Sequence, residues 1–268
     1  MILNICDVLH EPILWASWAV VWYLKPHVTF DAELPIKLWA RAFTRELEFP
    51  ATMAGYDELL GLLGEGDRFV PQSFAEMEGG TFVPRVAIVD PSRNWTMHVT
   101  SDSLNVECSP LPGRPINFET FCLEAAEQLG RILCAKEAKS HRLAVLWDRL
   151  LPTLRAEQLR EAPGRFLKLP PMFHSDPFEW EWRAAVRVER NFGGARDLTN
   201  TLATVRRVEA KIQGQASDRL WLQTDVNTDP RRISARFSGD DARAFVQTAP
   251  NWHNEVTAVV VAQMEQKS

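Results

Sequence analysis

Three polar residues in the C-terminal third are of the types that acid–base catalysis uses: Asp225, Asp229 and His253. A carboxylate within hydrogen-bond reach of an imidazole can orient the ring and assist proton transfer. We expect His253 near the start of the last helix, where the helix dipole disfavours the charged ring. Because the sequence alone does not bring these residues together, a packing or capping role for His253 is the simpler interpretation.

A second pair of carboxylates, Glu179 and Glu181, shares one face of an expected strand, with side chains about 6 to 7 Å apart. Paired carboxylates can transfer protons or hold a metal ion. The same face carries Arg183 and Arg187, so a solvent-exposed face with salt bridges is the simpler interpretation. The pair stays an alternative candidate for hydrolase or nuclease chemistry.

The familiar metal and phosphate motifs are incomplete in this sequence. Asp225 to Asp229 imitates the start of a calcium loop, but Pro230 replaces the glycine and Arg236 replaces the bidentate glutamate. There is no HxH, HExxH, CxxC or GxSxG, and residues 61–66 (GLLGEG) lack the Lys-Ser/Thr of a phosphate loop. We therefore expect no metal ion and no cofactor.

Aromatic residues are the other candidates for binding. The chain has ten Trp and two Tyr, and we expect most of the Trp side chains to fill wide cores. The alternative is an exposed aromatic surface for a partner. Trp180, Trp182 and Trp221 are the candidates for lining a ligand cavity or contacting a partner.

Charge and composition limit the partners and the compartment. The formal net charge of −5 argues against general nucleic-acid binding, because that affinity comes from Lys and Arg neutralising phosphates. Four scattered cysteines indicate a reducing cytoplasm. The most apolar stretch, residues 13–24, is too short to span a bilayer, and the N-terminus lacks the basic region of a signal peptide. We expect a cytoplasmic protein with no membrane contact.

Arginines near the C-terminus offer one local exception to the acidic balance. A basic patch could form from Arg206, Arg207, Arg231, Arg232 and Arg236. Solvated strand faces and turns explain these residues more simply.

Alternation and helical periodicity predict the elements that would position these residues. Strands are expected over 13–24, 81–89, 95–100, 104–108, 142–151, 178–189, 198–212 and 220–226. Helices are expected over 35–47, near 57–63 within an otherwise looped 50–80, over 118–133 with Asn117 as N-cap, and from 240 onward. We expect Pro250 to interrupt the last helix and Asn251 to cap its restart.

A run of strands followed by one long amphipathic helix occurs twice, over 81–136 and 178–266. This internal repeat predicts an α+β fold with two similar halves, each an antiparallel sheet covered by a long helix. The expected boundaries are residues 1–151 for the first half, a Pro-rich connector over 152–177, and residues 178–268 for the second half. We expect the halves to join through their sheets or through the N-terminal strand.

Several segments also carry a family resemblance. They are Glu11-Pro12-Ile13, the 95–106 hairpin with the 118–133 helix, residues 141–144 (HRLA), the 220–225 strand and Trp252-His253-Asn254. Together they resemble an uncharacterised, sporadically distributed bacterial protein family of similar length, over most of the chain. The Asn usual after the 141–144 segment is replaced by Asp148. The resemblance implies a two-half α+β fold with no assigned activity or catalytic residues, and a setting among accessory genes of defence or toxin–antitoxin systems.

The lack of a catalytic constellation, the acidic balance and the Trp excess favour a non-enzymatic binding protein. We expect it to act through a protein partner, as an accessory or neutralising component of a bacterial defence or toxin–antitoxin system. One alternative is a protein that binds a small apolar ligand in a cavity between sheet and helix. Another is a hydrolase or nuclease using the carboxylates and His253. The sequence specifies no oligomeric state.

Overall fold

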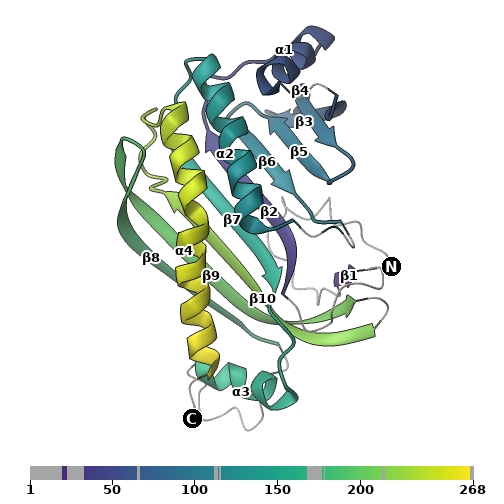
Figure 1. The fold of residues 1–268 in the computed structure, drawn as a ribbon, viewed down its shortest axis with the longest axis vertical. Helices are drawn as coiled ribbons and strands as arrows, with labels where there is room; N and C mark the ends of the chain where they lie inside the picture. The colour runs from purple at the N-terminus through teal and green to yellow at the C-terminus, as the bar shows by residue number, and fades with distance from the viewer. Residues whose placement is uncertain are drawn as a thin grey trace.

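The computed structural model in Figure 1 has one broad sheet with two long helices lying side by side on one face. It describes residues 20–22, 33–64, 67–111, 114, 116–167, 177, 179–212 and 215–265, with backbone alone for 20–22 and 212. The strands are β1 (Val20–Trp22), β2 (Leu34–Phe43), β3 (Val70–Glu78), β4 (Thr81–Asp90), β5 (Trp95–Val99), β6 (Ser103–Cys108), β7 (Arg142–Leu150), β8 (Glu181–Phe192), β9 (Ala195–Ile212) and β10 (Gln215–Thr228). The helices are α1 (Met53–Leu63), α2 (Phe118–Ala135), α3 (Ala156–Phe166) and α4 (Gly239–Glu265).

The described strands form a single sheet in the order β1-β9-β10-β7-β2-β6-β5-β4-β3, and β8 pairs with β9. Strands β2 to β10 pair antiparallel, whereas the short β1 lies parallel to β9. The α+β class is confirmed. The sheets expected for the two halves are joined into one, because β7, which precedes the Pro-rich connector, pairs with both β2 and β10. The strands give no support for two similar halves.

Both long helices cover the same face of this sheet. Helix α2 is capped as predicted, since the Asn117 side chain accepts a hydrogen bond from the Glu119 backbone N–H at 2.7 Å. Helices α2 and α4 approach closely where Gly130 meets Gly239; a Cβ on Gly130 would lie 3.0 Å from the Gly239 carbonyl oxygen. The two helices therefore share one apolar layer instead of covering two sheets.

Alternation along each strand defines two faces, which we name the helix face and the far face. Side chains such as Leu38, Val106 and Val145 point to the helix face and are fully buried in the main core. Their neighbours in sequence point to the far face, on the side away from α2 and α4. The core thus lies between the helix face and the two long helices.

Strand β2 replaces the helix predicted over 35–47. The apolar residues Leu38, Ala42 and Phe43 fit a helical stripe, but Leu38, Ala40 and Ala42 also alternate, and all three are buried on the helix face. Pairing with β6 on one side and β7 on the other makes β2 a central strand. Because both periodicities fit this short segment, strand pairing decides its conformation.

Helix α4 continues through Pro250, so the predicted interruption and the restart at Asn251 are wrong. Pro250 costs the helix one backbone hydrogen bond. Its neighbours Ala249 and Trp252 are buried against the sheet, and this burial keeps the helix continuous. As a result His253 lies in the middle of a 27-residue helix and not at a helix start.

Several other predicted strands and helices are present, some with different first or last residues. The strands around 81–108, the 142–151 strand and the 220–226 strand are confirmed. Helix α1 is longer than predicted, β3 occupies part of the expected loop, and α3 lies inside the expected connector. The strand predicted from residue 178 begins at Glu181, and residue 178 lies outside the described residues. Of the 13–24 strand, only 20–22 is described, as β1.

None of the helices in the described part of the chain is both long and apolar enough to span a membrane. Cys108 and Cys122 are buried free thiols, whereas Cys134 is free and exposed.

Candidate functional site

The proposed acid–base residues are separated by the sheet. Thr224 on β10 contacts the ring of His253 on α4, so Thr224 points to the helix face and Asp225 points to the far face. Asp225 accepts a hydrogen bond from the Asn227 side chain at 3.1 Å on that face. Asp229 follows the end of β10 and pairs with Arg231 at 2.8 Å. The described structure therefore does not bring His253 together with either carboxylate.

His253 sits in a fully buried aromatic cluster between α4 and the sheet. Its ring meets Phe118 of α2 edge-on at 4.9 Å, and its Nδ1 faces the Thr224 hydroxyl. Burial, with a further contribution from the charge of Arg149, lowers the pKa of His253 to about 3. The imidazole is neutral at physiological pH and fills the core, which agrees with the packing role.

The arginines of the expected basic patch are largely neutralised. Arg232 and Arg236 both pair with the buried carboxylate of Asp197, at 3.2 and 2.7 Å. Arg207 pairs with Asp218, and Arg206 lies over the Trp221 ring with its guanidinium carbon 4.0 Å from the centroid. These contacts hold the 229–237 loop against the sheet. Among the described residues, the five arginines therefore do not form a cluster of unpaired cations.

The Glu179 and Glu181 pair does not form the shared strand face expected from the sequence. Glu179 lies at a bend before β8, and Glu181 is the first residue of β8. Glu181 lies directly opposite Arg206 of β9, whose charge it stabilises. Both glutamates are exposed, in keeping with a solvent-facing role.

The three candidate Trp residues lie on two faces of the sheet. Trp180 and Trp182 contact Phe166 of α3, with ring centroids 5.8 and 5.3 Å apart, in a core that includes the end of α4. Trp221 lies on the far face beside Leu150 and Ala210. They line no common cavity, and every Trp whose side chain is described is buried or half-buried.

Strand β8, at one edge of the sheet, is held at both ends by aromatic side chains. At its C-terminal end Phe192 contacts Phe237, Phe245 and Trp252. At its N-terminal end Trp182 contacts α3. The Gly193-Gly194 turn adds a further anchor, since the Gly194 N–H donates to Asp241 of α4 at 3.0 Å.

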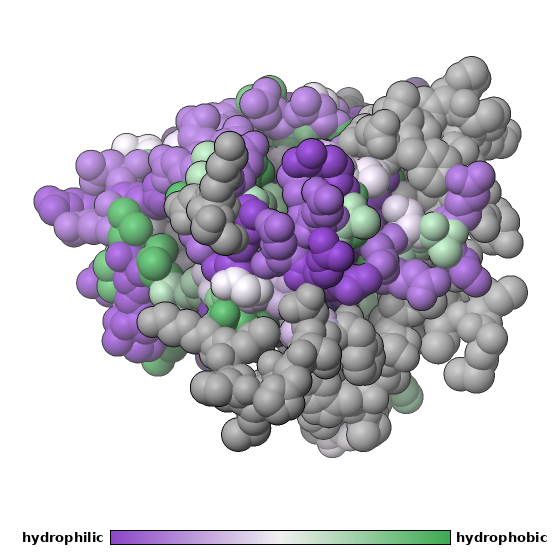
Figure 2. Space-filling view, turned by 90° about the horizontal axis from the view of Figure 1, so that it is seen from below, coloured by the Kyte–Doolittle hydropathy of each residue, from purple (hydrophilic) through white to green (hydrophobic). Residues whose placement is uncertain are grey.

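The middle of β8 is exposed between these anchors. Val186 is 56 % exposed and Val188 is 39 % exposed, although both point to the helix face. On α4, Glu255 reaches Arg190 of β8 at 3.2 Å, and Val259, one turn later on the same side, is 67 % exposed. Figure 2 shows apolar residues among polar ones on the left of the molecule, the side on which β8 lies in Figure 1. We name Val186, Val188 and Val259 the β8 patch.

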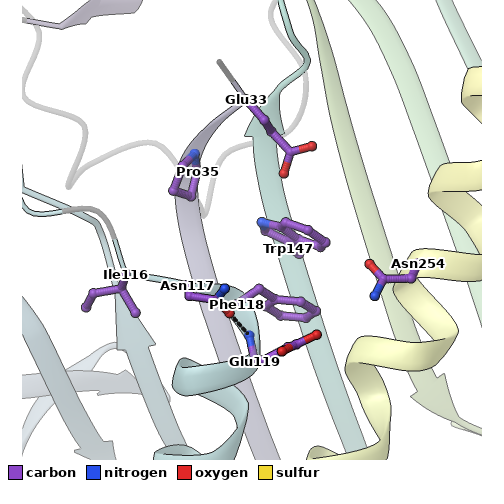
Figure 3. A pocket seen from close by; sticks show the side chains of 8 residues that line it. All are labelled: Glu33, Pro35, Ile116, Asn117, Phe118, Glu119, Trp147 and Asn254. Carbon is purple, nitrogen blue, oxygen red and sulfur yellow. Dashed lines mark hydrogen bonds between the residues drawn. The ribbon is translucent and has the colours of Figure 1, made fainter. Parts of the chain in front are cut away.

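A pocket of about 390 Å³ lies at the start of α2, over β7 and beside α4. Figure 3 shows the side chains around it, with Trp147 near the centre and Asn254 reaching in from α4. The pocket is lined by Glu33, Pro35, Ile116, Asn117, Phe118, Glu119, Trp147 and Asn254. Its volume falls within the range of small-ligand sites.

The chemistry of this pocket is mixed. Trp147 stacks on Phe118 at 4.3 Å, and the guanidinium carbon of buried Arg149 lies 3.4 Å from the Trp147 ring centroid. The indole Nε1 of Trp147 has no hydrogen-bond partner among the described residues. Burial raises the pKa of Glu33, which faces Arg149 at 3.4 Å. The pocket thus offers aromatic surface and carboxylate acceptors, and the unpartnered indole N–H of Trp147 is buried at its wall.

Asp148 is a buried ionisable residue that no sequence motif singles out. It lies between Trp147 and Arg149, which point to the helix face, so its carboxyl is on the far face. Burial raises its pKa to about 6, against the opposing effects of Gln223 and Lys37. The signal available in the sequence was an acidic residue within a mostly apolar strand that also carries Arg142 and Arg149. Lys37 and Gln223, directly opposite on β2 and β10, surround it with polar groups.

Within the described residues, no group of three or more His, Cys, Asp or Glu side chains is arranged to hold a metal ion. No family model matches the chain, and no curated protein matches it. The family resemblance drawn from the sequence therefore stays a prediction.

Proposed function

We propose that this chain is a non-enzymatic binding protein that acts through a protein partner, which docks on the outer side of β8. The observation that carries the proposal is the exposed middle of β8, a 12-residue edge strand with apolar side chains at its centre. An edge strand presents unpaired backbone groups, and natural proteins either protect such edges or use them to add a partner's strand. A role as an accessory or neutralising component of a defence or toxin–antitoxin system would rest on this contact.

The exposed side chains give the same site its specificity. A strand added to β8 would bring its own side chains beside Val186 and Val188 and beneath Val259 of α4. Backbone hydrogen bonds would supply affinity, while the β8 patch would select apolar side chains on the partner. The binding site is therefore an edge and a patch, not a catalytic cleft.

Affinity capture with matched variants tests the proposal. Val186→Lys places a charge at the centre of the β8 patch, whereas Val70→Lys places one on β3 at the opposite edge of the sheet, where Val70 is 49 % exposed. We expect a protein that is retained by the wild type and by Val70→Lys and lost by Val186→Lys. Equal retention by all three proteins would contradict the proposal.

A second candidate function is small-ligand binding in the pocket of Figure 3, and the unpartnered indole N–H of Trp147 favours it. Burial of a donor without a partner is unfavourable, and a bound acceptor would relieve it. Fragment screening by NMR tests this candidate, with the indole signal assigned through Trp147→Phe. Fragments that shift the Trp147 indole resonance would support it; hits confined to other Trp signals would contradict it.

A further inference from the structure

The backbone of β8 is paired on one side only within the described structure. Gly193 and Gly194 form a two-residue turn, so Phe192 and Ala195 beside it are a hydrogen-bonded pair. In an antiparallel pair, hydrogen-bonded positions alternate. Because the register runs without a shift back to Glu181, the backbone groups of Arg183, Ala185, Arg187 and Glu189 point away from β9.

The two edges of the sheet differ in protection. Strand β3, at the opposite edge, contains Pro71, which lacks a backbone donor, and its carboxylates Glu76 and Glu78 both pair with Arg85. Strand β8 contains no proline and no bulge in its pairing with β9. Among the described residues β8 is thus the longer edge and the one without proline, and such an edge is the kind that pairs with another strand.

Charges on β8 select a partner with the same sequence. Two copies related by a two-fold axis perpendicular to the sheet pair antiparallel, and side chains on the same face lie opposite each other. An axis at Ala185 would set Arg183 against Arg187 and is unfavourable. An axis at Val186 sets Arg183 of each copy against Glu189 of the other, which gives two complementary pairs.

The other registers are poorer. An axis at Arg187 would set that residue against itself. Axes at Ala184 and Val188 would set Arg187 against Glu181 or Glu189, but they pair a shorter part of the strand. The Val186 axis also lies near the middle of β8, so the overlap of the two strands is longest there. Arg183 makes no ion pair among the described residues, although its charge acts on Asp225, and the Glu189 pair with Arg196 is exposed and weak.

We propose that β8 pairs antiparallel with β8 of a second copy of this chain, about a two-fold axis at Val186. This inference rests on the proposed function and names the partner of the same edge. At the axis the two Val186 side chains meet at a position without backbone hydrogen bonds, where side chains approach most closely. Val188 of each copy lies opposite Ala184 of the other, and the two β8 patches cover each other.

Sedimentation equilibrium across a wide protein concentration range tests this pairing. We expect a wild-type dimer whose dissociation constant rises about tenfold or more in Val186→Lys and stays unchanged in Val70→Lys, since a buried charge opposes association. Arg183→Glu and Glu189→Arg should each weaken the dimer, and the double variant should restore it. Loss without restoration in the double variant would overturn the register at Val186.

Hydrogen exchange supplies a readout that does not depend on substitutions. The amides of Arg183, Ala185 and Arg187 should exchange slowly at dimer-forming concentrations and rapidly on dilution. A wild type that is monomeric throughout overturns the second-copy inference. If such a monomer still retains a protein that Val186→Lys loses, the proposed function stands; if it retains none, both fail.

Discussion

Two buried ionisable side chains on opposite faces of the sheet make opposite contributions to the pH dependence of stability. Asp148 on the far face has a raised pKa and His253 on the helix face has a lowered one, and in both cases burial is the largest cause. Burial disfavours the charged form of each group. The native state therefore keeps Asp148 protonated up to a higher pH than the unfolded chain does. It also keeps His253 neutral down to a lower pH.

Replacing Asp148 should stabilise the protein at neutral pH. The native pKa of about 6 exceeds the unfolded value, so the native state binds more protons between about pH 4 and 6 and its stability falls as pH rises through that window. Asp148→Asn removes this cost and should raise the free energy of unfolding near neutral pH by about 1 to 2 kcal/mol. Urea unfolding of the wild type and Asp148→Asn measures this difference in the free energy of unfolding.

The control for Asp148 is an exposed carboxylate. Asp218→Asn breaks only a surface pair with Arg207 and should change the free energy of unfolding by about 0.5 kcal/mol or less. Near pH 4 the effect of Asp148→Asn should largely vanish. Destabilisation by Asp148→Asn near neutral pH would show that the ionised carboxylate has a stabilising partner.

His253 should dominate the loss of stability on mild acidification. Its native pKa of about 3 lies below the unfolded value, so the unfolded state binds more protons below about pH 6.5 and stability falls with pH. Between about pH 7 and 5 the wild type should lose roughly 2 kcal/mol more than His253→Gln. Equal slopes of unfolding free energy against pH in the two proteins would rule out His253 as the source.

At the scale of elements, the crossing of α2 and α4 depends on a pair of glycines. A Cβ on Gly130 would meet the Gly239 carbonyl oxygen at 3.0 Å and the Arg243 Cβ at 3.1 Å. Both contacts are closer than side-chain carbons normally approach. The two helices can therefore share the helix face only while this point stays free of side chains.

Gly130→Ala should destabilise the protein by about 1 to 3 kcal/mol, because overpacking at the crossing outweighs the better helix propensity of Ala. Gly61→Ala in α1 is the matched control, since nothing lies within 4 Å of the added Cβ. We expect Gly61→Ala to stabilise by about 0.5 to 1 kcal/mol. Thermal and urea unfolding compare the two, and equal effects would contradict a tight crossing.

At the scale of the whole molecule, the continuous sheet links both ends of the described chain. Strand β7 pairs with β2 on one side and β10 on the other, so no described boundary separates two sheets. We expect one cooperative unfolding transition with equal calorimetric and van't Hoff enthalpies. Separate fragments 1–151 and 178–268 should fail to fold alone, because each exposes a central strand. Two transitions, or independently folded fragments, would contradict this expectation and support the predicted division at the Pro-rich connector.

Local patterns predicted the elements in which one periodicity dominates. The stripe along α2 and the alternation in β5, β6 and β10 admit one conformation each, and the Asn117 cap follows from residue type. Strand β2 was mispredicted because Leu38, Ala42 and Phe43 satisfy two periodicities. Strand β3 was missed because it is mostly exposed at an edge and has no apolar alternation to detect.

The candidate sites were less predictable because they join distant segments. The pocket combines Phe118 of α2, Trp147 of β7 and Asn254 of α4 with Glu33, which precedes β2, and no short-range spacing relates them. Alternation correctly placed Val186 on the same strand face as Trp182. The same alternation predicted that this face of β8 is buried along its whole length, whereas the helices cover only part of it and leave Val186 exposed.

The sequence by itself determined the α+β class, most strand and helix positions, and the lack of familiar catalytic motifs, because these depend on residue type and local period. The tertiary structure decided that the strands form one sheet, that α4 runs through Pro250, and that His253 and Asp225 lie on opposite faces. It also decided that the middle of β8 is uncovered. These features depend on which surfaces meet, and that is a property of the assembled chain and not of any segment within it.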